Sequence, residues 1–383
     1  MPQYLSPGVY VEEVPSAARP IAGVGTSTAG FIGVVADDVT MPLNPEDGET
    51  PLTVVPVDEP QLVTSWTEFK HKFGDFQGGN KTLAHAVYGF FNNGGSRCWV
   101  SRVSAETDLD NLAASLEKFE PIDEIAMVAA PGAIAPIQQD ALLDHCEKML
   151  DRVAILDGQP APATLTAQDI QGGTKNSTYG ALYFPWIQVF DPVANAIAPQ
   201  PPSGHIAGVY ARVDSTRGGY KAPANETIRG AVNLTVQLSK ANQDGLNPVG
   251  VNAIRAFGGN IKIWGARTLG GDDNGEFKYI STRRLFNFLR ESIDEGTQFA
   301  VFEPNNPSLW QRVSRNVNDF LLGQWRDGAL FGDTPKQAFF VKCDSETNPP
   351  DVRARGQVIA EVGVAIVQPA EFVIFRIQQM TGS

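Results

Sequence analysis

Short apolar runs alternate with helix-like segments along the first half of the chain, and this alternation limits the possible folds more than any other feature. Apolar runs of strand length lie at Phe31–Val35, Cys98–Val103, Ile125–Ala130 and Val153–Leu156. Between the last two, Ile137–Leu150 places apolar residues at helical spacing. A helix between two apolar strands is typical of a βαβ unit, whose strands are parallel. We therefore predict an α/β protein, mixed α+β in its details, and not a helical bundle.

Other segments extend this pattern. Aromatic residues at helical spacing predict one helix at Trp66–Phe73 and another at Leu83–Phe91. The stretch Val39–Pro60 carries five prolines and many acidic residues, so we expect an exposed loop there. Elsewhere, strands are predicted at Ala181–Asp191, Ile261–Trp264, Phe299–Phe302 and Phe339–Lys342, a helix at Leu109–Phe119, and a loop at Pro192–Pro202.

Both ends of the chain carry short extended segments. Near the N-terminus, a β-type run at Val9–Val14 lies between prolines. Near the C-terminus, Gly356–Val367 alternates with period two, Pro369 breaks this pattern, and a last β-type run follows at Phe372–Ile377. A short strand at a terminus is not stable alone. We therefore expect each run to pair with a strand edge in its own fold or in a neighbour.

The charge and the rare residues exclude several classes of protein. The chain has 43 acidic and 30 basic residues and a net charge of −13, which argues against a general nucleic-acid binder. Its four histidines show no metal-ligand spacing, and its three cysteines form no C-x-x-C pair. The N-terminus lacks the basic and apolar regions of a signal peptide, and no early apolar stretch is long enough to span a bilayer. We expect a chain that folds in a reducing cytoplasm.

Two glycine-containing stretches only partly match ligand-binding motifs. Gly25–Phe31, GTSTAGF, has the glycine spacing of a phosphate loop, but Phe31 stands where that loop needs Lys and no hydroxyl residue follows it. A tight turn leading into a strand explains it. Gly271–Glu276, GDDNGE, is too short for a Ca²⁺ loop, and we predict a hairpin turn on Asn274-Gly275. Cys146 lies on an apolar helix stripe, where a thiol is inert. We predict no catalytic residue, no cofactor and no metal site.

One predicted helix, Ser308–Gly328, has an unusual distribution of charge. At about 100° per residue its apolar residues gather on one side. Arg312, Arg315 and Arg326 lie on the other side, together with Asp319. A net-positive stripe on this acidic chain is either a solvated outer face or a docking face for an acidic partner.

The order and spacing of several motifs resemble contractile tail sheath proteins, which form the sheaths of contractile-tailed phages, R-type pyocins and phage-derived extracellular injection systems. The resemblance covers both ends of the chain, whereas residues 104–260 carry no matching motif. The length is similar to that of the short sheaths of pyocins and injection systems. The matching stretches are LSPGVYVEEV (Leu5–Val14), Gly23–Gly30, IWGARTL (Ile263–Leu269), YISTRRLFNFLRESI (Tyr279–Ile293), FEPNNPSLWQRV (Phe302–Val313), Gly328–Asp344 and PAEFVIFRI (Pro369–Ile377).

The resemblance implies a function in assembly. Sheath subunits form six-fold rings stacked around an inner tube, and terminal arms of neighbouring subunits pair into shared sheets. The sheath then contracts irreversibly and drives the tube through a target envelope without consuming a nucleotide. The implied partners are other copies of the chain, the inner tube protein, baseplate and terminal cap proteins, and sheath paralogues, with no nucleic acid and no membrane insertion. Assembly in the bacterial cytoplasm is implied, as part of a phage tail or of a released extracellular particle.

On this basis we predict a discontinuous α/β sheath core, residues 21–103 and 204–367, with a more variable α/β subdomain at residues 104–203. The arms are residues 1–20 and 368–383. Arg312, Arg315 and Arg326 are the candidates to face the tube. The residues predicted to pair with neighbouring subunits are Val9, Tyr10, Val11 and Glu12 in the first arm and Phe372, Val373, Ile374 and Phe375 in the second.

Two other functions remain open from the sequence. One is a nucleotide-dependent α/β enzyme that uses the GTSTAGF turn, and the other is a static tube or capsid component. The motifs also do not distinguish a phage tail from a pyocin or an injection system, or the extended from the contracted state.

Overall fold

The computed structural model of the chain describes residues 20–376, and these residues form two compact units. The larger unit contains residues 23–291 and 366–376, and the smaller unit contains residues 20–22 and 292–365. The chain passes between the units after Ala22, within helix α8 (Ile280–Thr297), and after Ala365. None of the helices in the described part combines the length and the apolarity needed to cross a bilayer.

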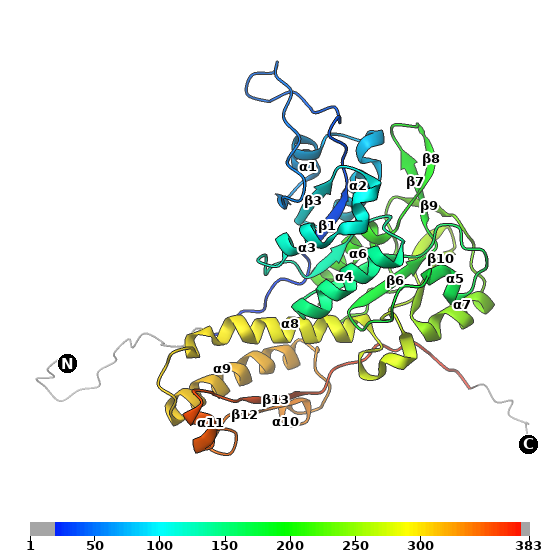
Figure 1. Cartoon of the computed structure of the whole chain (residues 1–383). Coiled ribbons are helices and arrows are strands. Elements are labelled where there is room, and N and C mark those ends of the chain that lie inside the picture. Colours follow the sequence, from blue (N-terminus) through cyan, green and yellow to red (C-terminus); the bar gives the residue numbers. More distant parts are fainter. Residues whose placement is uncertain (1–19, 377–383) are drawn as a thin grey trace, which may run out of the picture. The chain divides into compact units, whose positions relative to one another are not determined.

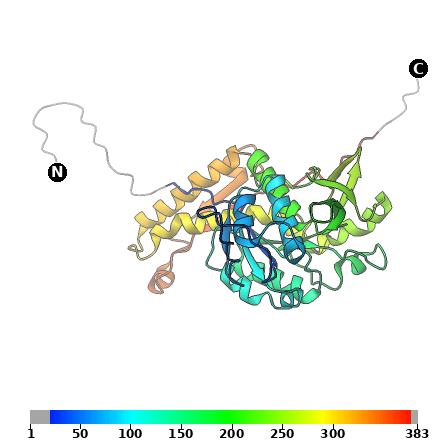
Figure 2. The same ribbon diagram turned by 90° about the horizontal axis from the view of Figure 1, so that it is seen from above.

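An eight-stranded sheet lies at the centre of the larger unit (Figures 1 and 2). The six inner strands are parallel, and the two edge strands run antiparallel to their neighbours. Parallel neighbours need crossover connections, which explains the helices between them in the sequence. In spatial order the strands are β11 (Asn260–Ile263), β10 (Val251–Phe257), β6 (Gly180–Phe184), β5 (Val153–Asp157), β4 (Met127–Ala129), β1 (Ala29–Val34), β3 (Cys98–Val103) and β2 (Gln61–Val63).

Helices cover both faces of this sheet, and each face has its own hydrophobic core. Successive residues of β1 show the division, because Phe31 belongs to one core and Ile32 to the other. Burial on both faces explains why these strands read as continuous apolar runs. One core includes α1 (Trp66–Phe73), α2 (Lys81–Asn93) and α6 (Ser203–Arg217), and the other includes α3 (Ala113–Phe119), α4 (Pro136–Met149), α5 (Ala167–Gln171) and α7 (Lys240–Leu246).

A small antiparallel sheet of β8 (Ala196–Gln200), β7 (Ile187–Asp191) and β9 (Ala231–Leu234) completes the strands of the larger unit. It corrects two predictions. The single strand predicted at Ala181–Asp191 is two strands in different sheets, because Pro185 cannot donate to a ladder and the chain turns there. The loop predicted at Pro192–Pro202 contains β8.

The smaller unit is built on α9 (Pro307–Arg326) and a hairpin of β12 (Phe339–Lys342) and β13 (Glu361–Val364). The Asn306 side chain caps α9 by accepting the backbone N–H of Leu309, and Gly328, with a φ of 84°, follows its end. The short helix α10 (Pro335–Ala338) directly precedes β12, and α11 (Pro350–Ala354) lies in the connection between β12 and β13. The predicted apolar side of α9 is confirmed by the burial of Trp310, Val313, Val317, Phe320 and Leu321.

Four further predictions differ from the structure. The helix predicted at Leu109–Phe119 is divided into a 3₁₀ helix, η2 (Glu106–Asn111), and α3. The strand predicted at Phe299–Phe302 is wrong, since η5 (Gln298–Ala300) and a turn occupy it. The hairpin turn predicted at Asn274-Gly275 is a 3₁₀ segment, η4 (Gly271–Phe277). Only Glu361–Val364 of the alternating stretch Gly356–Val367 forms a named strand.

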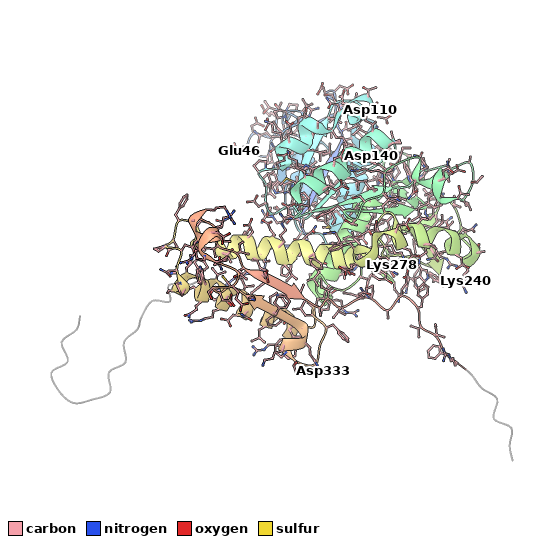
Figure 3. The ribbon with its side chains drawn as sticks, turned by 60° about the horizontal axis from the view of Figure 1, so that its bottom comes forward. Glu46, Asp110, Asp140, Lys240, Lys278 and Asp333 are labelled. Carbon is pink, nitrogen blue, oxygen red and sulfur yellow. The ribbon has the colours of Figure 1, made fainter. Side chains whose placement is uncertain are left out.

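The loop predicted at Val39–Pro60 is exposed in its middle but packed at its ends. Glu46, labelled in Figure 3, lies at the surface. Val39 is buried, and Val55 packs against the core while its carbonyl oxygen accepts a 2.5 Å hydrogen bond from Arg102 Nε. The large sheet also takes strands from both the predicted core (β1, β3) and the predicted subdomain at residues 104–203 (β4, β5, β6). These two parts therefore share one sheet.

Candidate functional site

Four consecutive large apolar residues are exposed near the C-terminus of the described chain. Phe372, Val373, Ile374 and Phe375 are 71%, 71%, 79% and 85% exposed, and residues 372–376 form no strand within this chain. A continuous exposed apolar segment of this kind marks a surface that is covered in an assembly or prone to aggregation. The other predicted arm residues, Val9, Tyr10, Val11 and Glu12, lie outside the described residues.

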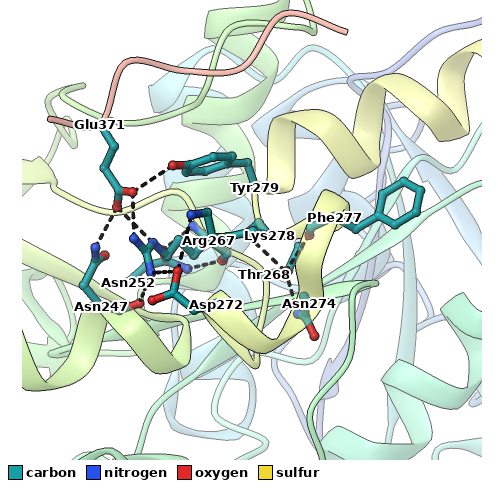
Figure 4. Close-up of polar contacts among 10 residues, drawn as sticks. All are labelled: Asn247, Asn252, Arg267, Thr268, Asp272, Asn274, Phe277, Lys278, Tyr279 and Glu371. Atoms are coloured by element: carbon teal, nitrogen blue, oxygen red, sulfur yellow. Dashed lines mark hydrogen bonds and ion pairs between the residues drawn. The ribbon is translucent and has the colours of Figure 1, made fainter. Parts of the chain in front are cut away.

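Glu371, directly before this apolar segment, is held by three side chains that we call, together with it, the Glu371 clamp (Figure 4). Arg267 binds both carboxylate oxygens, with Nε 3.0 Å from Oε1 and Nη2 2.8 Å from Oε2. Asn247 Nδ2 donates to Oε1 at 2.6 Å, and the Tyr279 hydroxyl donates to Oε2 at 2.9 Å. The clamp therefore satisfies both oxygens with two donors each.

The residues around Arg267 fix its position. Its backbone is bonded in both directions to the Asn252 side chain of β10, at 2.7 and 2.8 Å. Its Nη1 donates to the Asn247 carbonyl oxygen at 3.1 Å and lies 3.0 Å from Asp272, which also pairs with Lys278. Gly265 permits this packing, since a Cβ there would lie 2.8 Å from Asn252 Oδ1. Arg267 is thus held by contacts other than those to Glu371.

The electrostatics of the clamp favour the ion pair. Burial alone would raise the pKa of Glu371, but hydrogen bonds from Arg267, Asn247 and Tyr279 and the charge of Arg267 outweigh it and hold this pKa below its ordinary value. Burial and the bond to Glu371 raise the pKa of Tyr279 to about 12, so its hydroxyl remains a donor. At neutral pH the carboxylate is charged and accepts all its bonds.

The C-terminal segment also borders an open groove in the larger unit. Residues 367–371 and Val373 form one side of it. The opposite lining includes Lys221, Ala222, Trp264 and Ala266. The segment therefore runs along the larger unit up to the clamp, and of the apolar residues that follow only Val373 is among those that line the groove.

The three arginines predicted on one face of α9 differ in their surroundings. Arg315 and Arg326 are exposed. Arg312 is half-buried, pairs with Glu303 at 2.8 Å, and places its guanidinium 5.4 Å from the centre of the Phe299 ring. Two of the three charges are thus presented to the surroundings, and the third is already paired within the subunit.

The glycine-containing turn at Gly25–Phe31 closes a buried ion pair. Arg284 of α8 donates to both oxygens of Asp214, at 3.0 and 2.5 Å, and to the Thr26 carbonyl oxygen at 3.0 Å. The Thr26 hydroxyl donates to the same carboxylate at 2.7 Å. Gly30 allows α3 to pack on β1, since a Cβ there would lie 2.8 Å from the Phe119 ring. The residues of this turn thus have structural roles.

Three of the four histidines and Cys146 are buried. His85, His145 and His205 are buried, and burial lowers the pKa of His145 to about 4 and that of His205 to about 3. Cys146 is fully buried, which raises the pKa of its thiol. Within residues 20–376, no group of three or more His, Cys, Asp or Glu side chains is arranged to hold a metal ion.

Sequence reasoning missed the Glu371 clamp, although its parts lay in the quoted motifs. Arg267 belongs to IWGARTL, Tyr279 begins the next motif, and Glu371 lies in PAEFVIFRI. The separations of 104 and 92 residues gave no local signal. An arginine within an apolar motif and an acid directly before an apolar run were the only hints.

Comparisons with known proteins agree with the motifs and extend the similarity into residues 104–260, where no motif was matched. Residues 106–269 match the domain family described as phage tail sheath protein central domain, and residues 272–380 match the phage tail sheath C-terminal domain. A putative prophage major tail sheath protein of Pseudomonas aeruginosa strain UCBPP-PA14 is 25% identical over 287 residues, which cover 73% of this chain and 70% of that protein. The tail sheath protein of Enterobacteria phage T4 is 26% identical over 174 residues, which are 44% of this chain and 25% of that protein.

Solved structures match nearly the whole chain. The sheath complex of PVC, an extracellular contractile injection system, in its contracted state is 28% identical with a TM-score of 0.79, and the match covers 99% of both chains. The helical sheath of the anti-feeding prophage in its contracted state is 30% identical with a TM-score of 0.76, covering 97% of this chain and 99% of that one. A chain of the six-fold symmetrised baseplate of the same particle is 29% identical with a TM-score of 0.77, covering 99% and 100%.

Proposed function

The chain belongs to the contractile tail sheath family, and from this premise we propose how its subunits link to one another and to their partners. It is a structural subunit of a contractile sheath. The observation that carries this conclusion is the match to contracted sheaths over nearly the whole chain. Neither a nucleotide-dependent enzyme nor a static tube is supported.

We propose that six subunits form each ring and that the rings stack around an inner tube, with baseplate and cap proteins at the ends and sheath paralogues as further neighbours. The energy of contraction then lies in the difference between two packings of the same subunits. The GTSTAGF turn fits this scheme, because its residues close an ion pair and a helix contact. Assembly takes place in the bacterial cytoplasm on this proposal.

We further propose that residues 372–376 add as a strand to a neighbouring subunit, and that the N-terminal run Val9–Val14 is donated likewise. The exposure of four apolar side chains in a row supports this. The β12–β13 hairpin supplies a matching acceptor, because no other strand in the described residues pairs with its outer edges. A two-stranded sheet is marginally stable by itself, so added strands benefit acceptor and donor alike.

The basic residues of α9 suggest where the tube lies. We propose that Arg315 and Arg326, with Arg312, face an acidic surface of the inner tube in the extended state. Each exposed ion pair contributes little, but the contacts of a whole ring act together.

Truncation tests the exchange of arms. Variants that lack residues 1–15 or residues 372–383 are compared with the full chain by electron microscopy of assembled particles. We expect soluble, folded subunits that form no stable cylinders, because the body retains its buried core and loses only the donated strands. Circular dichroism and size-exclusion chromatography check the fold. Normal contractile cylinders from either truncation would show that the missing arm is not needed.

A further inference from the structure

We propose that the Glu371 clamp fixes the point and direction at which the C-terminal arm leaves its own subunit, so that Phe372–Phe375 reach the neighbouring copy in one register. This inference rests on the proposed exchange of arms. On this proposal the side chains of the clamp hold the start of the arm. A subunit can therefore keep the arm and yet present it in the wrong position.

The geometry suits an anchor. Arg267 grips Glu371 in a bidentate arrangement, which defines the direction of the carboxylate as well as its distance. The Arg267 side chain is only 4% exposed, so removal of its partner leaves buried N–H groups unpaired. Exposed surface pairs do not meet this condition, because water replaces the lost partner. The clamp therefore holds the root of the arm more firmly than a surface contact would.

The position of the clamp sets the length of the tether. With Glu371 held, the free arm begins at Phe372, and the five residues to Arg376 reach at most about 17 Å. Without the clamp, residues 367–371 can join the free segment and roughly double its reach, while Ile366 is still held in a β-bridge. A longer tether lowers the effective concentration of the strand at its acceptor and weakens its choice of register.

The clamp also determines which part of the subunit bears a pull on the arm. Force on Phe372 passes through Glu371 to Arg267. From there it passes through the Asn252 side chain into β10, a strand of the eight-stranded sheet. During contraction, the arm would thus load the larger unit's sheet and not the chain segment that leads back to β13.

Glu371→Ala removes the clamp and keeps the arm. Limited proteolysis of dilute, unassembled subunits with a broad-specificity protease should cut residues 367–371 faster by at least about tenfold, with the strands of the large sheet unchanged. Tyr279→Phe, which removes one of the four bonds, should give a smaller increase. Glu276→Gln, which neutralises an exposed acid on the nearby η4, is the matched control and should change neither segment.

Assembly of the same variants tests the proposal itself. We expect Glu371→Ala to require a protein concentration higher by about tenfold or more to form cylinders, or to form irregular ones. If Glu371→Ala forms normal cylinders at the normal concentration while the truncation of residues 372–383 forms none, the clamp has no positioning role although arm exchange holds. If the truncation also forms normal cylinders, the exchange of arms is itself wrong.

Discussion

Asp214 and Arg284 show how strongly this fold depends on single polar residues. Both side chains are 4% exposed, and burial would lower the pKa of Arg284 if the Asp214 carboxylate did not raise it. Because removing one partner leaves the other charge buried, we expect Asp214→Asn to lower the free energy of unfolding by about 3 kcal/mol. Urea denaturation measures this change. Asp273→Asn, at an exposed site, is the control, and equal stability of the two variants would contradict the prediction.

Phe302 illustrates a residue whose local conformation disagrees with its type. It is fully exposed and has a φ of 63°, a conformation that costs a non-glycine residue about 1 kcal/mol. Phe302→Gly should therefore stabilise the isolated subunit slightly, by up to about 1 kcal/mol, since no packed contact is lost. Thermal unfolding of the unassembled protein tests this. A clear loss of stability would mean that the phenyl ring of Phe302 makes stabilising contacts within its own subunit.

The Glu371 clamp should respond to acid. Its carboxyl has a pKa below the ordinary 4.5, so the stabilisation is complete above that value and is lost as the pH falls through the lower, folded-state pKa. Arg267 is the charged group that binds Glu371, Asp272 pairs with both Arg267 and Lys278, and Tyr279 keeps its proton up to about pH 12. The rate of proteolysis at residues 367–371, divided by that of an unstructured reference peptide at the same pH, should be flat at neutral pH and rise only in acid. In Glu371→Gln the acid-dependent step should be absent.

At the scale of elements, the sequence predicted best those strands that are compact apolar runs. Cys98–Val103 and Phe339–Lys342 match their strands residue for residue, because compact apolar runs between turns have few alternatives. The single strand predicted at Ala181–Asp191 is wrong because Pro185 interrupts it, although the aromatic residues on both sides favour a strand. Phe299–Phe302 failed because apolar residues there are not buried in a sheet. The sequence did not predict the clamp, because Glu371 reaches Arg267 only through tertiary folding and no local pattern indicates this contact.

The loop within Val39–Pro60 divides into a dispensable tip and necessary ends. Leu43 and Pro51 form a bridge, and the Leu52 N–H donates to the Pro42 carbonyl oxygen at 2.8 Å, so the two sides of the tip lie close together. Replacing residues 43–51 with a short glycine linker should leave the melting temperature, the rings and contraction nearly unchanged. Deleting residues 39–60 should destabilise the protein, because Arg102 then loses the Val55 carbonyl oxygen. Equal behaviour of the two deletions would refute this division.

Helix α9 offers a test of the proposed contact with the tube. Arg315→Glu with Arg326→Glu should weaken assembly on the tube at low salt and have less effect at high salt. Arg312→Glu should add a smaller effect, because Arg312 is already paired with Glu303. Arg353→Glu, an exposed residue on α11, is the control. Unchanged assembly of the double variant at low salt would mean that the stripe is a solvated face.

At the scale of the whole molecule, the buried cores and the exposed C-terminal arm contribute differently to stability and to the proposed assembly. The buried core lies within the described residues, and the exposed apolar side chains of residues 372–375 contribute little to it. A subunit without residues 372–383 should therefore fold, and should join a ring through its remaining surfaces. It should nevertheless leave an acceptor unfilled in the neighbouring subunit, because it has no strand to donate.

Mixing such subunits with full-length chains makes this consequence measurable. If each proposed ring contains several subunits and each missing strand breaks one link, the mean length of the cylinders should fall more steeply than in proportion to the truncated fraction. The Glu371→Ala variant should act more weakly in the same mixture, since its arm is present but poorly placed. Lengths are measured by electron microscopy at constant total protein. A linear decrease would mean that truncated subunits are excluded, and an unchanged length would mean that the links carry no load in the assembled sheath.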